Sequence, residues 1–192
     1  MLGSLGVIRH LAGHAKENPK DKEHFMTRIG LLAARTLVVA AASALLVTGT
    51  AQAAAPAKYA KHEDAAAVLR KAGVTWTSSG GCSNWNKRTC TSFTRINKAS
   101  VEGVIAFKKA SGCKVVITGG TEAGHSSGTY SHRNGYKTDI STKVSCVNTY
   151  ITRKFAKAGK RSDGAALYKS PAGNVYANEG SHWDITHYNG KA

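Results

Sequence analysis

An apolar run of eleven residues, LVVAAASALLV at positions 37–47, most constrains how this 192-residue chain can fold. Two arginines precede the run, and the small residues Ala51-Gln52-Ala53 follow it. A basic segment, a short apolar segment and an A-x-A site are typical of a cleaved secretory signal peptide, and eleven residues are too few to cross a bilayer. The pattern favours a signal peptide over a buried core helix, so we expect residues 1–53 to be removed on export.

The segment before this signal is polar and charged, and Met26 opens a signal of ordinary length. We expect the true start at Met26 and interpret residues 1–25 as an extension; an unusually long basic segment is the alternative. After cleavage near Ala53, residues 54–62 are predicted to form an Ala/Pro-rich linker. Residues 63–192 are predicted to form one domain, which is long enough to bury a core. The mature protein is expected to be extracellular and associated with the cell wall.

The mature part of the chain is strongly basic. Of the 27 Lys/Arg and 11 Asp/Glu residues, six and three lie before Ala54, so the remainder carries 21 and 8, a net charge of +13. Such a charge favours polyanionic partners, namely nucleic acid, anionic lipid or wall polymers. Export argues against nucleic acid, and signal cleavage argues against a membrane. Anionic wall polymers are therefore the expected partner, with a purely solubilising charge as the alternative.

All four cysteines lie after the predicted signal, at positions 82, 90, 113 and 146. An even number in an exported chain predicts two disulfides, with three possible pairings. No pair has the C-x-x-C spacing of a thiolate zinc site. The cysteines are therefore expected to be structural.

Hydrophobic periodicity predicts helices over 63–71, 97–110 and 147–158, and strands over 114–118, 136–141, 166–177 (as a hairpin) and 182–188. Asn97 is expected to cap the second helix. Helices that precede a small sheet, with one helix inserted, indicate an α+β fold. On this order the first two cysteines close one loop and the other two flank neighbouring strands, so we expect the pairs Cys82–Cys90 and Cys113–Cys146.

The histidines of the mature part are clustered with its few acids. Four of the five histidines and three of the eight acids lie in the segment around SHRNGYKTD and in EGSHWDITH. Imidazole and carboxylate suit zinc, and a catalytic zinc keeps three protein ligands and a water. His132 on a loop and Asp139 on the following strand can meet at one ion, because Gly135 lets the chain turn between them.

The third ligand must come from EGSHWDITH, residues 179–187. At two places in this segment, an acid stands three positions before a histidine. In one register Glu179 is the general base and His182 the ligand. In the other register Asp184 is the base and His187 the ligand. In either case the carboxylate accepts the proton of the attacking water and passes it to the leaving amine. The residue types alone leave both registers open.

The first segment, HRNGYKTD, resembles the H-x-x-G-x-x-x-D motif of the M15-type zinc peptidases, which include D-Ala-D-Ala carboxypeptidases and L-alanyl-D-glutamate endopeptidases. The second segment, EGSHW, is similar to the acid-x-x-His motif that this family has near a tryptophan. The resemblance is to the secreted actinobacterial type and runs from about Cys82 to Asn189. Two positions depart from the family pattern, since Tyr130 stands where a serine is common and Lys137 where a small residue is usual.

The resemblance implies that His132, Asp139 and His182 bind Zn²⁺ and that Glu179 is the catalytic base, a register that the adjacent Trp183 favours. It also implies a fold like that of the hedgehog and lysostaphin-type group. In that fold a small antiparallel sheet carries the zinc site and about three helices flank it.

The activity that the resemblance implies is that of a monomeric zinc metallopeptidase that hydrolyses peptide bonds in peptidoglycan stem peptides. One alternative is a non-catalytic wall- or polyanion-binding protein with a structural or degenerate zinc site, which His125 or His187 as a fourth ligand would favour. A metal-free secreted inhibitor or toxin, stabilised by its disulfides, is the other alternative.

Overall fold

Three helices and seven strands make up residues 54–192, the part of the chain that the computed structural model describes. The helices are α1 (His62–Lys71), α2 (Lys98–Ser111) and α3 (Ser145–Lys154). The strands are β1 (Thr75–Trp76), β2 (Val116–Gly119), β3 (Lys137–Ser141), β4 (Ala156–Lys160), β5 (Ala166–Lys169), β6 (Val175–Asn178) and β7 (His182–Thr186). The α+β prediction is confirmed. The predicted signal peptide and start site lie outside the described residues.

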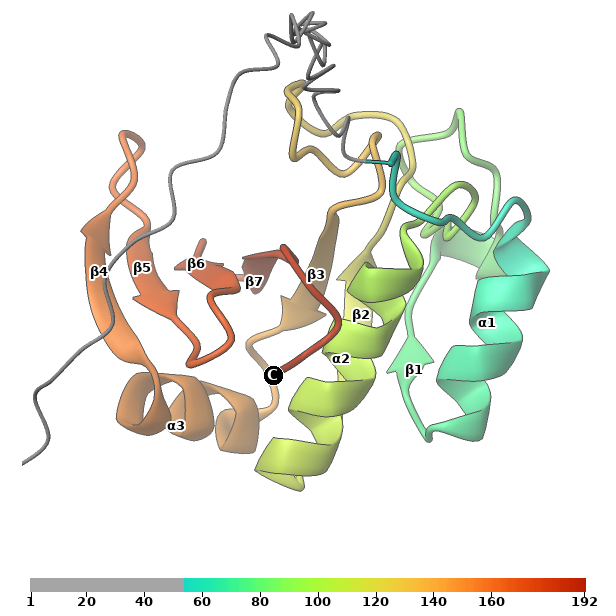
Figure 1. Ribbon diagram of the computed structural model, residues 1–192. Coiled ribbons are helices and arrows are strands. Elements are labelled where there is room, and N and C mark those ends of the chain that lie inside the picture. Colours follow the sequence, from blue (N-terminus) through green and yellow to red (C-terminus); the bar gives the residue numbers. More distant parts are fainter. Residues whose placement is uncertain (1–53) are drawn as a thin grey trace, which may run out of the picture. The chain divides into compact units, whose positions relative to one another are not determined.

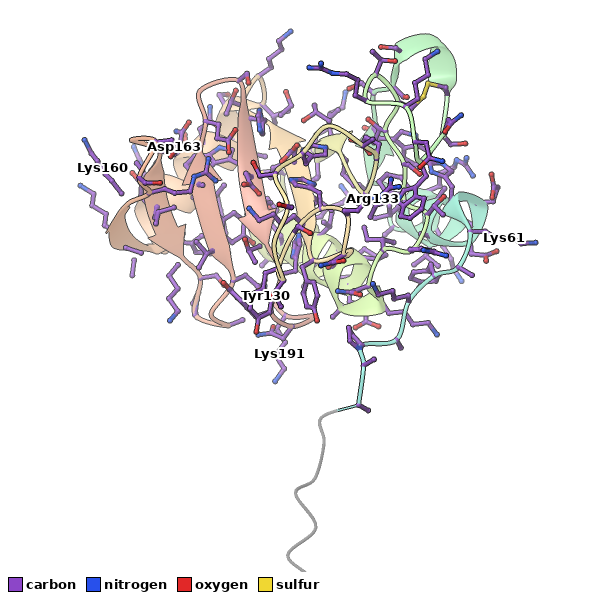
Figure 2. The ribbon with its side chains drawn as sticks, turned by 90° about the horizontal axis from the view of Figure 1, so that it is seen from above. Lys61, Tyr130, Arg133, Lys160, Asp163 and Lys191 are labelled. Atoms are coloured by element: carbon purple, nitrogen blue, oxygen red, sulfur yellow. A yellow bond between two sulfur atoms is a disulfide. The ribbon has the colours of Figure 1, made fainter. Side chains whose placement is uncertain are left out.

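The strands form one sheet in the order β1-β2-β3-β7-β6-β5-β4 (Figure 1). The pair β1–β2 is parallel and the other five pairs are antiparallel. Strands β2 and β7 both pair with β3, so the loop after β2 lies at the start of β3 and the turn before β7 lies at its end. Figure 2 shows Lys160 and Asp163 of the β4–β5 hairpin on the opposite side of the molecule from Lys61.

In the central strands β3 and β7, side chains alternate between the two faces of the sheet, because successive side chains of a strand point to opposite faces. Asp139 is paired with Asp184, and Ser141 with His182, so these polar side chains share one face. The residues between them point to the other face; they are Thr138, Ile140, Trp183 and Ile185, each no more than 1% exposed.

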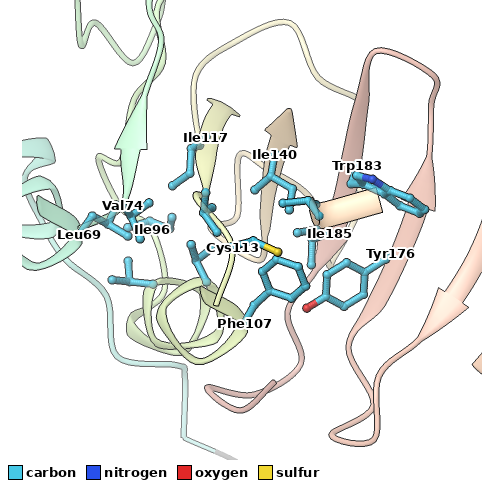
Figure 3. Packing of buried hydrophobic residues seen from close by; sticks show 14 of the residues in the cluster. Leu69, Val74, Ile96, Phe107, Cys113, Ile117, Ile140, Tyr176, Trp183 and Ile185 are labelled. Carbon is cyan, nitrogen blue, oxygen red and sulfur yellow. The ribbon is translucent and has the colours of Figure 1, made fainter. Parts of the chain in front are cut away.

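The helices pack against the apolar face of the sheet (Figure 3). The core consists mainly of Leu69 from α1, Val101, Val104 and Phe107 from α2, Val147 and Ile151 from α3, and Ile117, Ile140, Tyr176, Trp183 and Ile185 from the strands. The indole N–H of Trp183 donates to Asn148 Oδ1 at 2.8 Å, which ties β7 to α3. Packing on one face thereby fixes the positions of the polar residues on the other.

The predicted helix over 147–158 is wrong at its C-terminal end. Helix α3 ends at Lys154, and Phe155 has extended backbone angles (φ −101°, ψ 149°) with its side chain in the core. Residues 156–160 then pair with β5 as an exposed edge strand, which a sequence without alternating hydrophobicity (AKAGK) does not reveal. Strand β1 was not predicted either, because two residues give no periodic signal.

Asn97 lies at the N-terminus of α2, as predicted, but its side chain makes no capping hydrogen bond. The end of the helix is instead held by Ser100 Oγ, which donates to the carbonyl of Gly135 at 2.7 Å. This bond connects α2 to the turn between His132 and β3.

Both predicted disulfides are confirmed, and no cysteine in residues 54–192 is free. Cys82–Cys90 closes the loop before α2, and Cys113–Cys146 joins the segment before β2 to the first turn of α3. Disulfides of this kind indicate an oxidising environment. Among the described residues, no helix has the length and apolar character needed to span a membrane.

Candidate metal centre

A polar cleft of about 570 Å³ lies on the uncovered face of the sheet, where β3 and β7 meet the loop after β2. Strand β3 contributes Asp139 to its lining, and β7 contributes His182 and Asp184. His132 reaches the cleft from the loop, and Glu179 from the turn before β7. The structure therefore brings the predicted ligands and both candidate bases into one cleft.

His132 is held so that one ring nitrogen faces this cleft. Its Nδ1–H donates to the carbonyl of Gly120 at 2.6 Å, since a carbonyl oxygen can only accept. Nε2 is then directed toward Asp139 Oδ1 at 3.2 Å and Asp184 Oδ1 at 3.6 Å. A histidine whose second nitrogen is fixed by a backbone carbonyl is the usual arrangement of a metal ligand.

The turn that carries His132 into position depends on Gly135. Its φ of 83° is left-handed, and a Cβ there would lie 2.5 Å from the carbonyl oxygen of Arg95. Gly119 of β2 has a related role, because a Cβ at this position would overlap the carboxylate of its strand partner Asp139. Gly135 thus lets the turn pack against the backbone before α2, and Gly119 leaves room for the side chain of Asp139.

His182 approaches the same carboxylate from β7. Its Nδ1 lies 2.9 Å from Ser181 Oγ, and its Nε2 lies 3.7 Å from Asp139 Oδ1. Two atoms bound to a tetrahedral zinc at about 2.0–2.1 Å are about 3.3–3.4 Å apart. The separations of 3.2 and 3.7 Å from Asp139 Oδ1 to the two Nε2 atoms bracket this value. Within residues 54–192, however, the group whose ligand atoms all lie within 4.8 Å of one another consists of His125, His132 and Asp139 and does not include His182.

The carboxylates of the cleft have unused acceptor capacity. Asp139 Oδ1 and Asp184 Oδ1 are buried and have no hydrogen-bond partner among the described residues. Burial by itself lowers the pKa of His132, but Asp139 and Asp184 together outweigh it and raise the pKa to about 10. The cleft thus favours a positive charge between these groups, and a divalent cation bound by them would supply it.

His125 is a third imidazole near Asp139 that the main ligand prediction did not include. One ligand atom each from His125, His132 and Asp139 lie within 4.8 Å of one another, a group that could hold a metal ion. However, the rings of His125 and His132 are stacked, with centroids 3.7 Å apart and planes inclined by only 15°. The ring nitrogens of two parallel imidazoles direct their lone pairs side by side. In this arrangement His125 covers the ring of His132, and the two lone pairs do not converge on one metal ion.

Glu122 holds His125 and the loop around it in place, and no sequence pattern pointed to it. Its buried carboxylate accepts hydrogen bonds from the backbone N–H groups of Ser92 and Gly120 at 2.7 and 3.0 Å. His125 Nε2 lies 3.1 Å from the same carboxylate. Glu122 therefore joins the loop before α2 to the loop that carries His132.

Two cations occupy the side of the cleft near Glu179 and Asp184. Asp184 Oδ2 accepts hydrogen bonds from Lys137 Nζ at 2.6 Å and from Arg161 Nη1 at 2.9 Å. Arg161 also donates to Glu179 Oε1 and is itself held by Asp163 at 2.6 and 3.0 Å. Arg161 was not predicted, because it lies on the β4–β5 hairpin, and β4 was not recognised in the sequence.

The two candidate bases differ in their surroundings. Burial by itself raises the pKa of Asp184, but hydrogen bonds and charges from His132 and Lys137 outweigh it and hold the pKa well below its usual range. Glu179 is exposed at the rim, and its Oε2 lies 3.1 Å from His182 Nε2. Asp184 is thus held in its ionised form, which disfavours it as a proton acceptor.

His187, the alternative third ligand, lies on the opposite face of the sheet. Its Nε2 is 2.9 Å from Thr138 Oγ1, and its ring packs against Gly103 of α2. The side chain is 1% exposed, and the sheet separates it from the cleft. In this arrangement His187 and Asp139 cannot bind the same ion.

Three arginines of the described chain lie outside the cleft. Arg95 and Arg133 stack on the ring of Trp85, with guanidinium carbons 4.8 and 3.2 Å from its centroid. Arg88 lines a separate depression. Lys137, by contrast, lines the cleft with the candidate ligands.

The geometry of the cleft is the evidence on which a function must rest. When the chain is compared with protein-family models, with curated proteins and with solved structures, none of the three comparisons gives a match.

Proposed function

We propose that this protein is a secreted zinc metallopeptidase of the M15 type that hydrolyses peptide bonds in peptidoglycan stem peptides. The observation that carries the proposal is the convergence of His132 Nε2 and His182 Nε2 on the buried, unpaired Oδ1 of Asp139. Two imidazoles and one carboxylate form a three-ligand set typical of catalytic zinc, which keeps a position open for water. When bound, zinc would polarise the substrate carbonyl and acidify a water molecule at the site.

In this proposal Glu179 is the general base. Its carboxylate stands beside the ligand His182, at the open rim where substrate enters. It takes a proton from the attacking water and delivers it to the amine that leaves. Asp184 is less suited to this step, because Lys137 stabilises its ionised form in addition to Arg161, which contacts both carboxylates. The role of Asp184 is to hold these cations and to fix the ring of His132.

The remaining parts of the proposal concern fold group, location and partner. A central antiparallel sheet that carries the site on one face and helices on the other is compatible with the hedgehog-like group. The two disulfides support an extracellular location, as does the signal-like segment in the sequence. The net charge of +13 over residues 54–192 suits a matrix of anionic wall polymers.

One observation favours a second candidate, a non-catalytic wall-binding protein with a structural zinc site. His125 Nδ1 lies 3.9 Å from Asp139 Oδ2, close enough for a ring rotation to make it a fourth protein ligand. Structural zinc sites have four protein ligands and no open position. The stacking of His125 on His132 is why we place this candidate second.

The proposal is tested on the purified mature protein by zinc stoichiometry and by digestion of peptidoglycan with mass analysis of the products. We expect His132→Ala and His182→Ala to lose both zinc and activity. We expect Glu179→Gln to keep zinc and to lose at least about 10²-fold in rate, because an amide cannot accept the proton. Glu63→Gln, an exposed change on α1, is the matched control and should keep both properties.

The same measurements separate the candidates. Bound zinc without any released peptide, together with loss of zinc in His125→Ala, would establish the structural site instead. Wild-type zinc content in His132→Ala and His182→Ala would remove the proposed centre. Asp184→Asn with full zinc and no activity, beside an active Glu179→Gln, would make Asp184 the base.

A further inference from the structure

A second cleft of about 640 Å³ adjoins the candidate metal centre on the side away from Arg161. Asp139 and His182 line both clefts, so a substrate held at these residues can extend into the second one. Its remaining lining residues are Thr77, Lys114, Val116, Thr118, Ser141, Lys143, Val144 and Ser181. The second cleft is thus lined by two valines, several hydroxyl groups and two lysines, and Asp139 is its single acid among the described residues.

The two lysines are available to a ligand. Within residues 54–192, neither Lys114 nor Lys143 has an acidic partner within 4.0 Å, whereas Lys137 and Arg161 in the first cleft are bound to carboxylates. The charge of the two clefts therefore differs. The first contains its own counterions, and the second presents ammonium groups that nothing in the described chain neutralises.

The segments that carry these lysines are fixed relative to each other. Lys114 follows Cys113, and Lys143 precedes Cys146 by three residues, so the Cys113–Cys146 disulfide joins the two segments directly. Val144, next to Lys143, packs against the core. Two unpaired cationic side chains therefore lie on segments that a disulfide joins. Together they form a preorganised anion-binding site.

The distance to the metal centre sets what the ligand can be. Lys143 lies four positions after Asp139 in the chain, which corresponds to no more than about 14 Å of extended backbone. A peptide held at Asp139 and His182 would cover this distance in two to four residues, at about 3.3–3.6 Å each.

We propose that Lys114 and Lys143 form a subsite for a carboxylate carried by the substrate peptide, two to four residues from the bond that is cleaved. This inference rests on the proposed function, because it places the scissile bond at Asp139 and His182. The hydroxyls of Thr118 and Ser141 also line the second cleft and can hydrogen-bond to the peptide backbone.

The test uses zinc-loaded mature protein and soluble muropeptides in two forms, one with free carboxylates and one with the carboxylates amidated. The variants are Lys114→Gln/Lys143→Gln and, as a control with the same change in net charge, Lys157→Gln/Lys160→Gln on the exposed edge strand β4. For the free form, we expect the first variant to raise KM about 5–10-fold with kcat little changed, since two partly exposed charge pairs contribute to binding alone. For the amidated form, the wild type and this variant should have the same, high KM.

Binding measured without turnover separates this inference from the proposed function. Calorimetry of both muropeptide forms is carried out on Glu179→Gln and on the same variant with both lysines replaced by glutamine. Preferential binding of the free form that requires the two lysines supports the subsite even if the wild type cleaves neither muropeptide. The subsite is refuted if both forms bind or react equally, if neither form binds, or if the β4 control has the same effect.

Discussion

Removal of the two disulfides, one at a time, gives a quantitative test of how each loop stabilises the fold. The variants are Cys113→Ala/Cys146→Ala and Cys82→Ala/Cys90→Ala. In each disulfide one cysteine is buried, since Cys113 and Cys90 are both 2% exposed. The cost of truncating a buried sulfur is therefore similar in the two variants, and their difference reports mainly on loop closure.

The expected magnitudes follow from the length of the loops. Cys113–Cys146 closes 33 residues, which in the chain-entropy treatment corresponds to about 3.7 kcal/mol at 25 °C. Cys82–Cys90 closes 8 residues and corresponds to about 2.5 kcal/mol. The longer loop contains β2, β3 and the segment with His132, so the disordered chain gains more freedom when this bond is absent. We expect its removal to cost about 1.2 kcal/mol more than removal of the short one.

The assay is urea unfolding followed by tryptophan fluorescence, with EDTA present so that metal binding does not contribute to the free energy of unfolding. Equal slopes for the two variants are required before their midpoints are compared. A result in which the variant without Cys82–Cys90 loses as much stability as the other, or more, would refute the loop-entropy reasoning. It would show instead that the short disulfide holds native contacts in the loop before α2.

Three further predictions concern side chains on the two faces of the sheet. Gly119→Ala should weaken zinc binding about 10–100-fold without unfolding the protein, because the new Cβ displaces the carboxylate of Asp139; zinc titration and circular dichroism check this. Gly103→Ala should lower the free energy of unfolding by about 1–3 kcal/mol, because the new Cβ would lie 2.5 Å from His187 Nδ1. This loss is expected even though alanine favours a helix more than glycine does, and urea midpoints measure it. Burial lowers the pKa of His187 from 6.5 to about 3, so the unfolded chain binds a proton in this range that the folded protein does not. The free energy of unfolding should therefore fall as the pH decreases from about 6.5 toward 3, by up to about 1.4 kcal/mol per pH unit. Urea midpoints measured over a pH series test this, and His187→Gln should remove this part of the pH dependence.

Much of the fold could be predicted from local patterns. Helices α1 and α2 and strands β3 and β7 follow from apolar periodicity and from Gly112, whose left-handed φ of 67° ends α2. The disulfide pairs followed from the order of these elements. Strand β4 could not be predicted, because all five of its side chains are exposed and its sequence carries no alternation. Its pairing with β5 is decided by the sheet and not by its own residues.

The candidate site likewise has residues that the sequence predicted and an arrangement that only the tertiary structure decided. The sequence by itself supplied His132, Asp139, His182 and two possible bases, because scarce acids and histidines in a basic chain indicate a shared task. It could not choose between His182 and His187, since both follow an acid by three positions. The tertiary structure decides where each lies, because a strand sends alternate side chains to opposite faces and His187 continues β7 on the helix-covered face.

The surroundings of the site depend wholly on long-range contacts. Arg161 and Lys114 each lie 18 positions along the chain from the nearest predicted ligand or base, and Glu122 lies 10 positions from His132. No local sequence pattern connects these three residues with the site. The sequence determined which chemical groups are available, because ligand types and glycine positions are properties of single residues. Only the tertiary structure decided which charges meet, because strand order and the packing of helices on one face bring together residues that the chain itself keeps apart.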